Sequence, residues 1–212
     1  MLMKYFRYLV YTFVLTTFSI ARAEPAVDFF RAVNVDDAGT VKALLARGFD
    51  PNTLSEKGQV GLYLALRDDS PKVVAALLAH PSTRIDATNA ADETPLMMAA
   101  LRGNLDGARQ LIDRGAAVNR PGWTPLHYAA TGPEPRLVAL LLERGAQLEA
   151  PSPNRTTPLM MASRYGPEGA VDLLLARGAS LRARNDAGLG PVEFAELAAR
   201  EALAARLKAA LR

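Results

Sequence analysis

The chain of 212 residues contains no cysteine and only two histidines. Without cysteine it can form no disulfide, no thiolate-based active site and no cysteine-ligated zinc site. Two histidines provide little material for any other metal site. The signature motifs of serine hydrolases, P-loop nucleotide-binding proteins, zinc proteases and EF-hand proteins are also absent. The composition therefore gives no reason to expect a metal or a cofactor.

Outside the first 23 positions, the chain has no surplus of basic over acidic residues. The chain has 25 Lys and Arg against 22 Asp and Glu, a net charge of +3. Lys4, Arg7 and Arg22 account for this surplus, because no acidic residue precedes Glu24. A body of zero net charge gives no electrostatic reason to expect nucleic acid or an anionic membrane surface as a partner.

The first 23 residues have the layout of a secretory signal peptide. Two basic residues precede an uncharged run of 14 residues, Tyr8 to Ala21, and Ala21-Arg22-Ala23 is a small-x-small cleavage pattern. A membrane-spanning helix needs roughly 20 residues. We therefore expect residues 1–23 to be removed during export, with no stable membrane insertion afterwards. Export without cysteine points to a bacterial periplasm, and an extracellular destination is the alternative.

The rest of the chain repeats at a nearly fixed period. Thr-Pro-Leu occurs at 94–96, 124–126 and 157–159, and two degenerate copies end at Leu62 and Val192. The third residues of these five segments are spaced by 34, 30, 33 and 33 positions. Such a period is typical of proteins built from stacked structural repeats.

Each period predicts a pair of short helices. Thr is a favoured N-cap and Pro is tolerated at the first helical position, so Thr-Pro predicts the start of the first helix. A short turn and a leucine-rich second helix follow. That helix is expected to end at Arg-Gly, where Gly supplies a left-handed C-cap, as at 114–115, 144–145 and 177–178. A polar loop then leads to the next Thr-Pro.

These motifs make the chain similar to the ankyrin-repeat family. The segment Gly122 to Ala130 matches the family pattern G-x-T-P-L-H-x-A-A, and Gly115 to Asn119 matches its closing G-A-D-V-N. The resemblance covers about residues 24–212. It implies an all-α fold, a curved solenoid of stacked helix-turn-helix units with β-hairpin-like finger loops. It also implies a protein without catalytic residues or cofactors.

The repeat pattern predicts six units after the signal peptide. Capping repeats are expected at both ends, because each repeat buries its faces only against its neighbours. In the last unit we expect one continuous helix from Phe194 to Leu211. The predicted units are an N-terminal capping repeat at 24–56, a degenerate repeat at 57–90, a repeat with a short finger at 91–120, two repeats at 121–153 and 154–186, and a C-terminal capping repeat at 187–212.

Some departures from the pattern predict local differences. His80-Pro81 replaces Arg-Gly, and because Pro cannot take a positive φ, this helix must end differently. Ser70-Pro71 is expected to compensate as a strong N-cap pair for the same helix. Three residues are missing from the finger before Trp123, which should therefore be blunt. Arg155 stands where the finger usually has Gly.

His127 is the candidate catalyst if the protein is an enzyme. A role as general base or metal ligand needs a second ligand or an orienting carboxylate at a defined spacing, which the sequence does not provide. The resemblance instead implies that the histidine of Thr-Pro-Leu-His makes hydrogen bonds within and between repeats. We predict this structural role for His127.

The resemblance also places two rows of side chains in the concave groove and others on the fingers. The finger positions are Gln59, Glu93, Trp123 and Thr156, and the second groove row includes Thr131. Trp, Tyr, Met and Arg are the residues that carry binding energy at protein contacts. In the alternative interpretation, Leu64, Met98 and Met161 are buried between helices and only fill space. The predicted protein-binding residues are Leu64, Arg67, Met98, Leu101, Trp123, Tyr128, Met161, Arg164 and Tyr165.

The sequence therefore favours an exported ankyrin-repeat scaffold that binds a protein partner through its groove and fingers. We expect it to act as a monomer, to carry out no catalysis and to bind no nucleic acid. Two alternatives keep protein binding but change its purpose. One is a periplasmic immunity-type protein that neutralises a toxin, and the other is a secreted effector that acts on a host protein.

Overall fold

The structure is a computed structural model that describes residues 25–211. The predicted signal peptide at 1–23 lies outside the described residues. The chain divides into two compact units, whose boundary in the sequence falls between Arg84 and Ile85. Across residues 25–211 all regular elements are helices, apart from one isolated antiparallel bridge between Leu54 and Val60. The prediction of an all-α fold is confirmed, and no helix in this range is long and apolar enough to cross a membrane.

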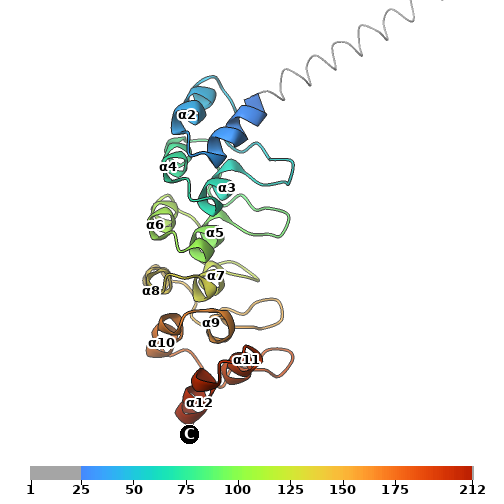
Figure 1. Cartoon of the computed structure of the whole chain (residues 1–212), viewed down its shortest axis with the longest axis vertical. Coiled ribbons are helices and arrows are strands. Elements are labelled where there is room, and N and C mark those ends of the chain that lie inside the picture. Colours follow the sequence, from blue (N-terminus) through green and yellow to red (C-terminus); the bar gives the residue numbers. More distant parts are fainter. Residues whose placement is uncertain (1–24, 212) are drawn as a thin grey trace, which may run out of the picture. The chain divides into compact units, whose positions relative to one another are not determined.

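The first unit consists of short helices and one finger loop. Its elements are a helix at 25–34, α2 (Ala38–Ala46), α3 (Gly61–Arg67) and α4 (Pro71–Ala79) (Figure 1). Asp37 caps α2 by accepting the Thr40 backbone N–H at 3.0 Å. After α2 the chain turns at Gly48, whose φ is 86°. This helix therefore begins after a capping acidic residue and ends before a glycine turn.

The second unit repeats the helix pair. Its helices are α5 (Pro95–Arg102), α6 (Leu105–Asp113), α7 (Pro125–Thr131), α8 (Arg136–Glu143), α9 (Pro158–Tyr165), α10 (Glu168–Ala176), α11 (Pro191–Leu197) and α12 (Glu201–Ala210). Within this unit α5, α7, α9 and α11 form one layer and α6, α8 and α10 a second, and the finger loops project from the first layer (Figure 1). This arrangement confirms the stacked helix-turn-helix units.

Thr-Pro and Arg-Gly mark the helix ends as predicted. The Thr94 hydroxyl accepts the Met97 N–H at 3.3 Å, and the Thr157 hydroxyl accepts the Met160 N–H at 3.4 Å. The second helix of each pair ends at a glycine with a positive φ. Glycine adopts this conformation at little cost because it has no Cβ. These φ values are 91° at Gly115, 87° at Gly145 and 89° at Gly178.

The helix before Pro81 ends differently, as predicted. His80 is extended, with φ −82° and ψ 126°. The Thr83 hydroxyl then turns back and donates to the Leu77 carbonyl at 2.6 Å. The Thr83 side chain thus donates to a carbonyl at the helix end that would otherwise accept a hydrogen bond from the Gly-based turn.

Ser70 and Pro71 lie at the N-cap and the first position of α4, as predicted, but the Ser70 side chain does not cap the helix. Its hydroxyl donates to the Val33 carbonyl at 2.8 Å and makes no capping bond to α4. Asp36 takes that role, because its carboxylate accepts the Val73 N–H at 2.9 Å. The N-terminus of α4 is therefore capped by Asp36, which lies in the turn before α2, 37 residues earlier in the chain.

The predicted continuous helix from Phe194 to Leu211 is wrong. The chain turns between α11 and α12 at Ala199, which has a φ of 54°. Arg200 follows this turn, and its guanidinium binds the end of α9 at distances of 2.8–3.0 Å. No Gly or Pro marks the break, which falls at the repeat position where Asp69 and Gly103 make the same left-handed turn between helices. The carbonyls that accept these bonds belong to Ala162, Ser163 and Gly166.

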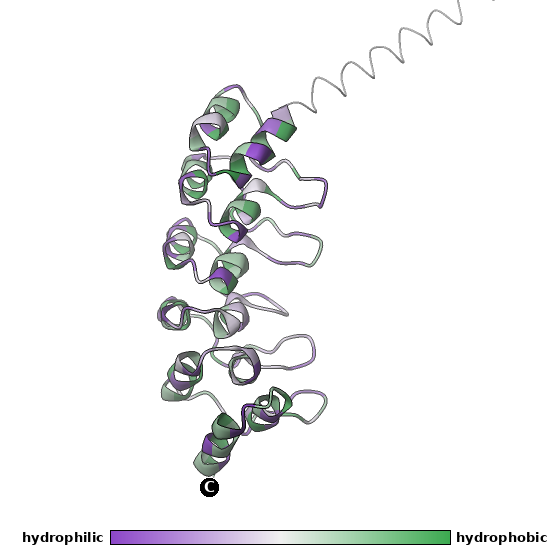
Figure 2. Cartoon of the chain, viewed as in Figure 1, coloured by the Kyte–Doolittle hydropathy of each residue, from purple (hydrophilic) through white to green (hydrophobic). Residues whose placement is uncertain are grey.

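The core lies between the helices, which carry most of the hydrophobic residues, while the loops are mostly polar (Figure 2). Close approach of successive helix pairs depends on small residues. A Cβ on Gly132 would lie 2.4 Å from the Ala100 carbonyl oxygen, and a Cβ on Gly166 would lie 2.0 Å from that of Ala130. Both distances are far below van der Waals contact, so only glycine fits.

Four finger loops share the same tip. A backbone N–H donates to the carbonyl four residues later, and the side chain of the first residue accepts the N–H of the last. The fourth residue has a left-handed φ of 59–73°. These tips lie at Ser55–Gln59, Asn89–Glu93, Ser152–Thr156 and Asn185–Leu189.

Two of the tips place a residue with a Cβ in the left-handed conformation. Arg155 has a φ of 59° and Asp92 one of 61°. The remaining finger, before Trp123, contains no bond of this kind among the described residues, which confirms that it is blunt.

Candidate functional site

Five of the predicted binding residues line one pocket in the second unit. Its volume is about 330 Å³. The wall comes from the first-layer helices α5, α7 and α9 and from the blunt finger. Large apolar and aromatic side chains dominate its surface. The lining residues are Leu101, Trp123, His127, Tyr128, Thr131, Met161 and Tyr165.

Three of these side chains are open to solvent. Leu101 is 36% exposed, Trp123 37% and Tyr165 57%. Single exposed apolar residues are normal on protein surfaces, but a contiguous group around a hollow is typical of a binding site. The pocket therefore has the apolar centre expected of a contact surface.

Trp123 owes its position to the blunt finger and to His127. The two rings meet edge to face, with centroids 5.1 Å apart. Gly122, immediately before the tryptophan, has a φ of 78°. This turn leads the chain into Thr124 and α7, and the loop before it projects less far than the other fingers (Figure 1).

His127 is buried and uses both ring nitrogens. The Thr124 N–H donates to Nδ1 at 3.2 Å, so Nδ1 must be unprotonated. Nε2 then carries the proton and donates to the Thr156 carbonyl at 3.0 Å. Burial lowers the pKa of His127, which keeps the ring neutral. These are the bonds within and between helix pairs that the resemblance implied.

Tyr128 contributes its ring to the pocket while its hydroxyl is held. The hydroxyl donates to a Glu93 carboxylate oxygen at 3.0 Å. Burial, followed by this hydrogen bond, raises the pKa of Tyr128 above its ordinary value. The phenol therefore stays protonated, and the ring has a fixed orientation.

Arg164 lies at the rim of the pocket. Its guanidinium carbon is 5.0 Å from the centroid of the Tyr165 ring, a cation–π arrangement. Nearby, Arg120 bridges to Asp92 with an N···O distance of 2.6 Å. This ion pair joins the blunt finger to the finger before it.

Several predicted residues do not line the pocket. Leu64 and Met98 are only 6% exposed, so for these two the space-filling interpretation holds. Met161 is partly exposed and does line the pocket. Arg67 lies in the first unit, where it donates to Asp68 at 2.7 Å. Thr156, predicted as a finger contact, is buried.

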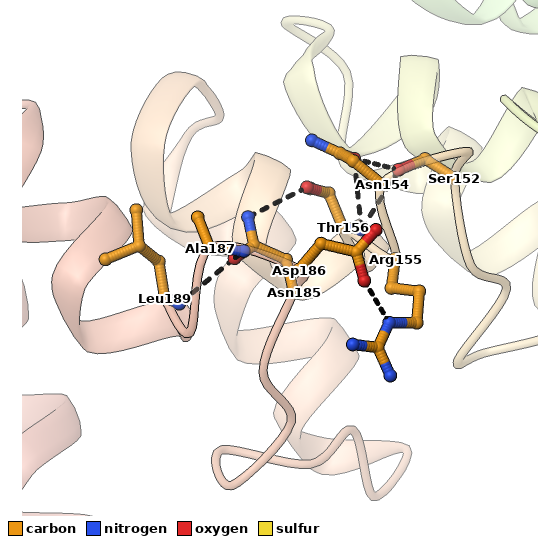
Figure 3. A network of polar contacts seen from close by, with 8 residues as sticks. All are labelled: Ser152, Asn154, Arg155, Thr156, Asn185, Asp186, Ala187 and Leu189. Atoms are coloured by element: carbon orange, nitrogen blue, oxygen red, sulfur yellow. Dashed lines mark hydrogen bonds and ion pairs between the residues drawn. The ribbon is translucent and has the colours of Figure 1, made fainter.

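Thr156 belongs instead to a polar network that joins two fingers (Figure 3). Asn185 donates to the Thr156 hydroxyl at 3.3 Å, and the Asp186 N–H donates to the Asn154 carbonyl at 3.0 Å. Arg155 and Asp186 form an ion pair across the same gap. Sequence analysis missed this network. Asn185 and Ser152 occupy equivalent positions in successive repeats, and this equivalence is the sequence signal that could have predicted the network.

Comparison with known proteins places the chain among repeat proteins. A family model described as ankyrin repeats in three copies matches residues 29–121 and 115–185. Ankyrin repeat and SOCS box protein 16 of Homo sapiens is 32% identical over 166 residues, which are 73% of this chain and 37% of that protein. The NF-kappa-B p105 subunit of Gallus gallus is 31% identical over 169 residues, 76% of this chain and 17% of that protein. The chain thus spans well under half the length of these relatives.

A similar chain occurs in a solved complex. That structure contains a predatory endopeptidase from Bdellovibrio bacteriovorus bound to an immunity protein. The match has a TM-score of 0.73 and 26% sequence identity, and it covers 85% of this chain and 96% of that one. Ankyrin repeats mediate protein binding and are in general not catalytic. The chain belongs to the ankyrin-repeat family.

Proposed function

We propose that this protein is an exported ankyrin-repeat scaffold that binds a protein partner, without catalysis, through the pocket beside the blunt finger. The observation that carries the proposal is the cluster of exposed Leu101, Trp123 and Tyr165 around one hollow of about 330 Å³. Aromatic residues at the centre of a contact surface commonly dominate its binding energy. A rigid helix layer holds the cluster, which reduces the entropy lost on binding.

Export is part of the proposal. It rests on the signal-peptide pattern of residues 1–23. Fractionation of cells that express the full chain should recover it in the periplasm, with Glu24 as the first residue of the mature protein. Recovery of the uncleaved chain from the cytosol would contradict export.

The binding site is tested by a double variant, Trp123→Ala with Tyr165→Ala, used as bait for partner capture from periplasmic extract. Leu197→Ala is the matched control, because Leu197 is 56% exposed, lies in the same unit and does not line the pocket. The double variant should lose the captured protein, and the control should retain it. Melting temperatures of all three proteins should agree within a few degrees. Equal capture by the double variant would reject the pocket as the binding site.

Similarity to the endopeptidase–immunity complex favours a second candidate function. In that case the protein would bind a toxic peptidase one to one and block its activity. The purified chain should then inhibit a peptidase encoded by the same genome at equimolar concentration. Full peptidase activity in the presence of excess chain would exclude this function and leave general partner binding intact.

A further inference from the structure

We propose that the pocket receives a partner segment that carries a large apolar side chain with a carboxylate beside it. This inference rests on the proposed function and specifies the chemistry of the partner. Its support is the positive charge of the helices that line the pocket and the position of Arg164 over the Tyr165 ring.

The three helices that line the pocket carry charges of one sign. Their sequences contain two charged residues in total, Arg102 at the end of α5 and Arg164 near the end of α9. Arg102 directly follows Leu101, and Arg164 directly precedes Tyr165. Both Leu101 and Tyr165 line the pocket. Neither arginine forms an ion pair or a side-chain hydrogen bond within the described part of the chain.

The carboxylates near the pocket already have partners. Asp92 pairs with Arg120 at 2.6 Å and Glu134 with Arg136 at 2.6 Å. Glu168 pairs with Arg206 at 3.5 Å, and Glu93 accepts the Tyr128 hydroxyl. The charges carried by the three helices that line the hollow are therefore both positive. An incoming lysine would meet two unpaired arginines, whereas an incoming carboxylate would neutralise one of them.

Arg164 is also positioned for such a contact. Its guanidinium lies over the Tyr165 ring, 5.0 Å from the centroid, which fixes the planar group while leaving its N–H donors free. Because Tyr165 lines the pocket, an apolar side chain in the hollow would bring its neighbouring residue close to Arg164. One anchor and one adjacent carboxylate would thus be recognised together.

Trp123 is the only tryptophan of the chain, so its indole N–H gives a single NMR signal that reports on the pocket. We would titrate the full mature chain with three N-acetylated, C-amidated tetrapeptides. They are Gly-Phe-Asp-Gly, the same peptide with Lys for Asp, and the same peptide with Ala for Phe. The Asp peptide should shift the indole signal with an affinity about two- to fivefold higher than the Lys peptide. The Ala peptide should cause no shift.

Arg164→Gln should remove the preference for the Asp peptide over the Lys peptide. The matched control is Arg177→Gln, which removes one charge from the same unit at a position away from the pocket. This control should keep the preference. Equal or tighter binding of the Lys peptide, an unchanged preference in Arg164→Gln, or no shift with any peptide would each overturn the inference.

Capture experiments separate this inference from the proposed function. If the native partner is lost with Trp123→Ala and Tyr165→Ala but retained at full affinity with Arg164→Gln, the pocket binds a partner and the carboxylate proposal fails. If the aromatic double variant still captures the partner, the proposed function itself fails.

Discussion

The Nε2 atom of His127 lies 3.0 Å from the carbonyl oxygen of Thr156, so a side chain of one helix pair bonds the finger of the next. The same ring accepts the Thr124 N–H through Nδ1. This double contact requires a neutral imidazole with its proton on Nε2. Protonation of Nδ1 would break the bond to Thr124 in a buried site.

Stability should therefore depend on the protonation of His127. Burial lowers the pKa of this group in the folded protein below the unfolded value of 6.5, so the unfolded state binds the proton more readily. The contribution is complete above pH 6.5 and is lost as the pH falls through the folded-state pKa. Urea unfolding at pH 7.5 and pH 5.5 should show a larger loss for the wild type than for His127→Met. Parallel losses in both proteins would contradict this account.

His127→Met also tests the bond to Thr156. Met97 and Met160 occupy the corresponding positions of the neighbouring helix pairs, and their sulfur atoms lie 3.4 Å from the N–H of the capping threonine. The substitution should thus keep the local cap and remove the bond between repeats together with the ring contact to Trp123. We expect a loss of about 1–2 kcal/mol in the free energy of unfolding at pH 7.5. A neutral effect would mean that these two contacts together contribute no net stability.

Gly132 and Gly166 should tolerate no side chain. Alanine at either position would place its Cβ within 2.4 Å of a backbone oxygen of the preceding helix pair. We expect Gly132→Ala to cost about 3 kcal/mol or more, because the clash can be relieved only by separating helices. Gly145→Ala is the control: its Cβ meets no atom within 4 Å, and only the φ of 87° opposes it, at a cost of about 1 kcal/mol. Thermal unfolding of both variants checks the difference.

Asn185 should matter more than the ion pair beside it. Its side chain accepts the N–H groups of Ala187 and Leu189, both at 3.0 Å, and is buried. Asn185→Ala should cost about 1–3 kcal/mol. Arg155→Ala should cost less than about 1 kcal/mol, because the Arg155–Asp186 pair is exposed to solvent. Asn185→Ser should recover part of the loss, since Ser152 makes the equivalent bond in its own finger. Chemical denaturation ranks the three variants.

Arg200 should fasten the last helix to the repeat before it. Its three bonds to carbonyl oxygens at the end of α9 have no replacement when the guanidinium is removed. We expect Arg200→Ala to lower the free energy of unfolding by about 2–3 kcal/mol. Relative to the wild type, hydrogen exchange in Arg200→Ala should be accelerated more in α12 than in α5. Arg206→Ala, which removes only exposed ion pairs, should leave the exchange of α12 nearly unchanged.

Local signals predicted the fold well where the cause of the structure is local. Thr94-Pro95 and Arg114-Gly115 fix helix ends through capping and backbone preference, which act within a few residues. One error arose where a distant partner decides. Ser70 turns to the Val33 carbonyl and leaves capping to Asp36. The break at Ala199 has a different cause, because it falls at the inter-helix turn position of the repeat that Asp69 and Gly103 also occupy.

The candidate site was predicted in part for the same reason. Repeat register placed Leu101, Tyr128, Met161 and Tyr165 on one face, and the structure brings these side chains together with Trp123. Register alone does not tell how deeply a side chain is packed. Leu64 and Met98 were predicted to lie in the same groove as Tyr128, yet both are buried.

Each of the four full finger tips closes on itself, through a bond between its own first and last residues. Loss of three residues from the finger before Trp123 has left the capping of α7 at Thr124 intact. Finger length is thus uncoupled from helix registry in this scaffold. Loops of new length or sequence should be graftable between Arg120 and Trp123, because Asn119 and Arg120 bond the neighbouring repeats, which makes this the natural point at which to redesign specificity without rebuilding the core.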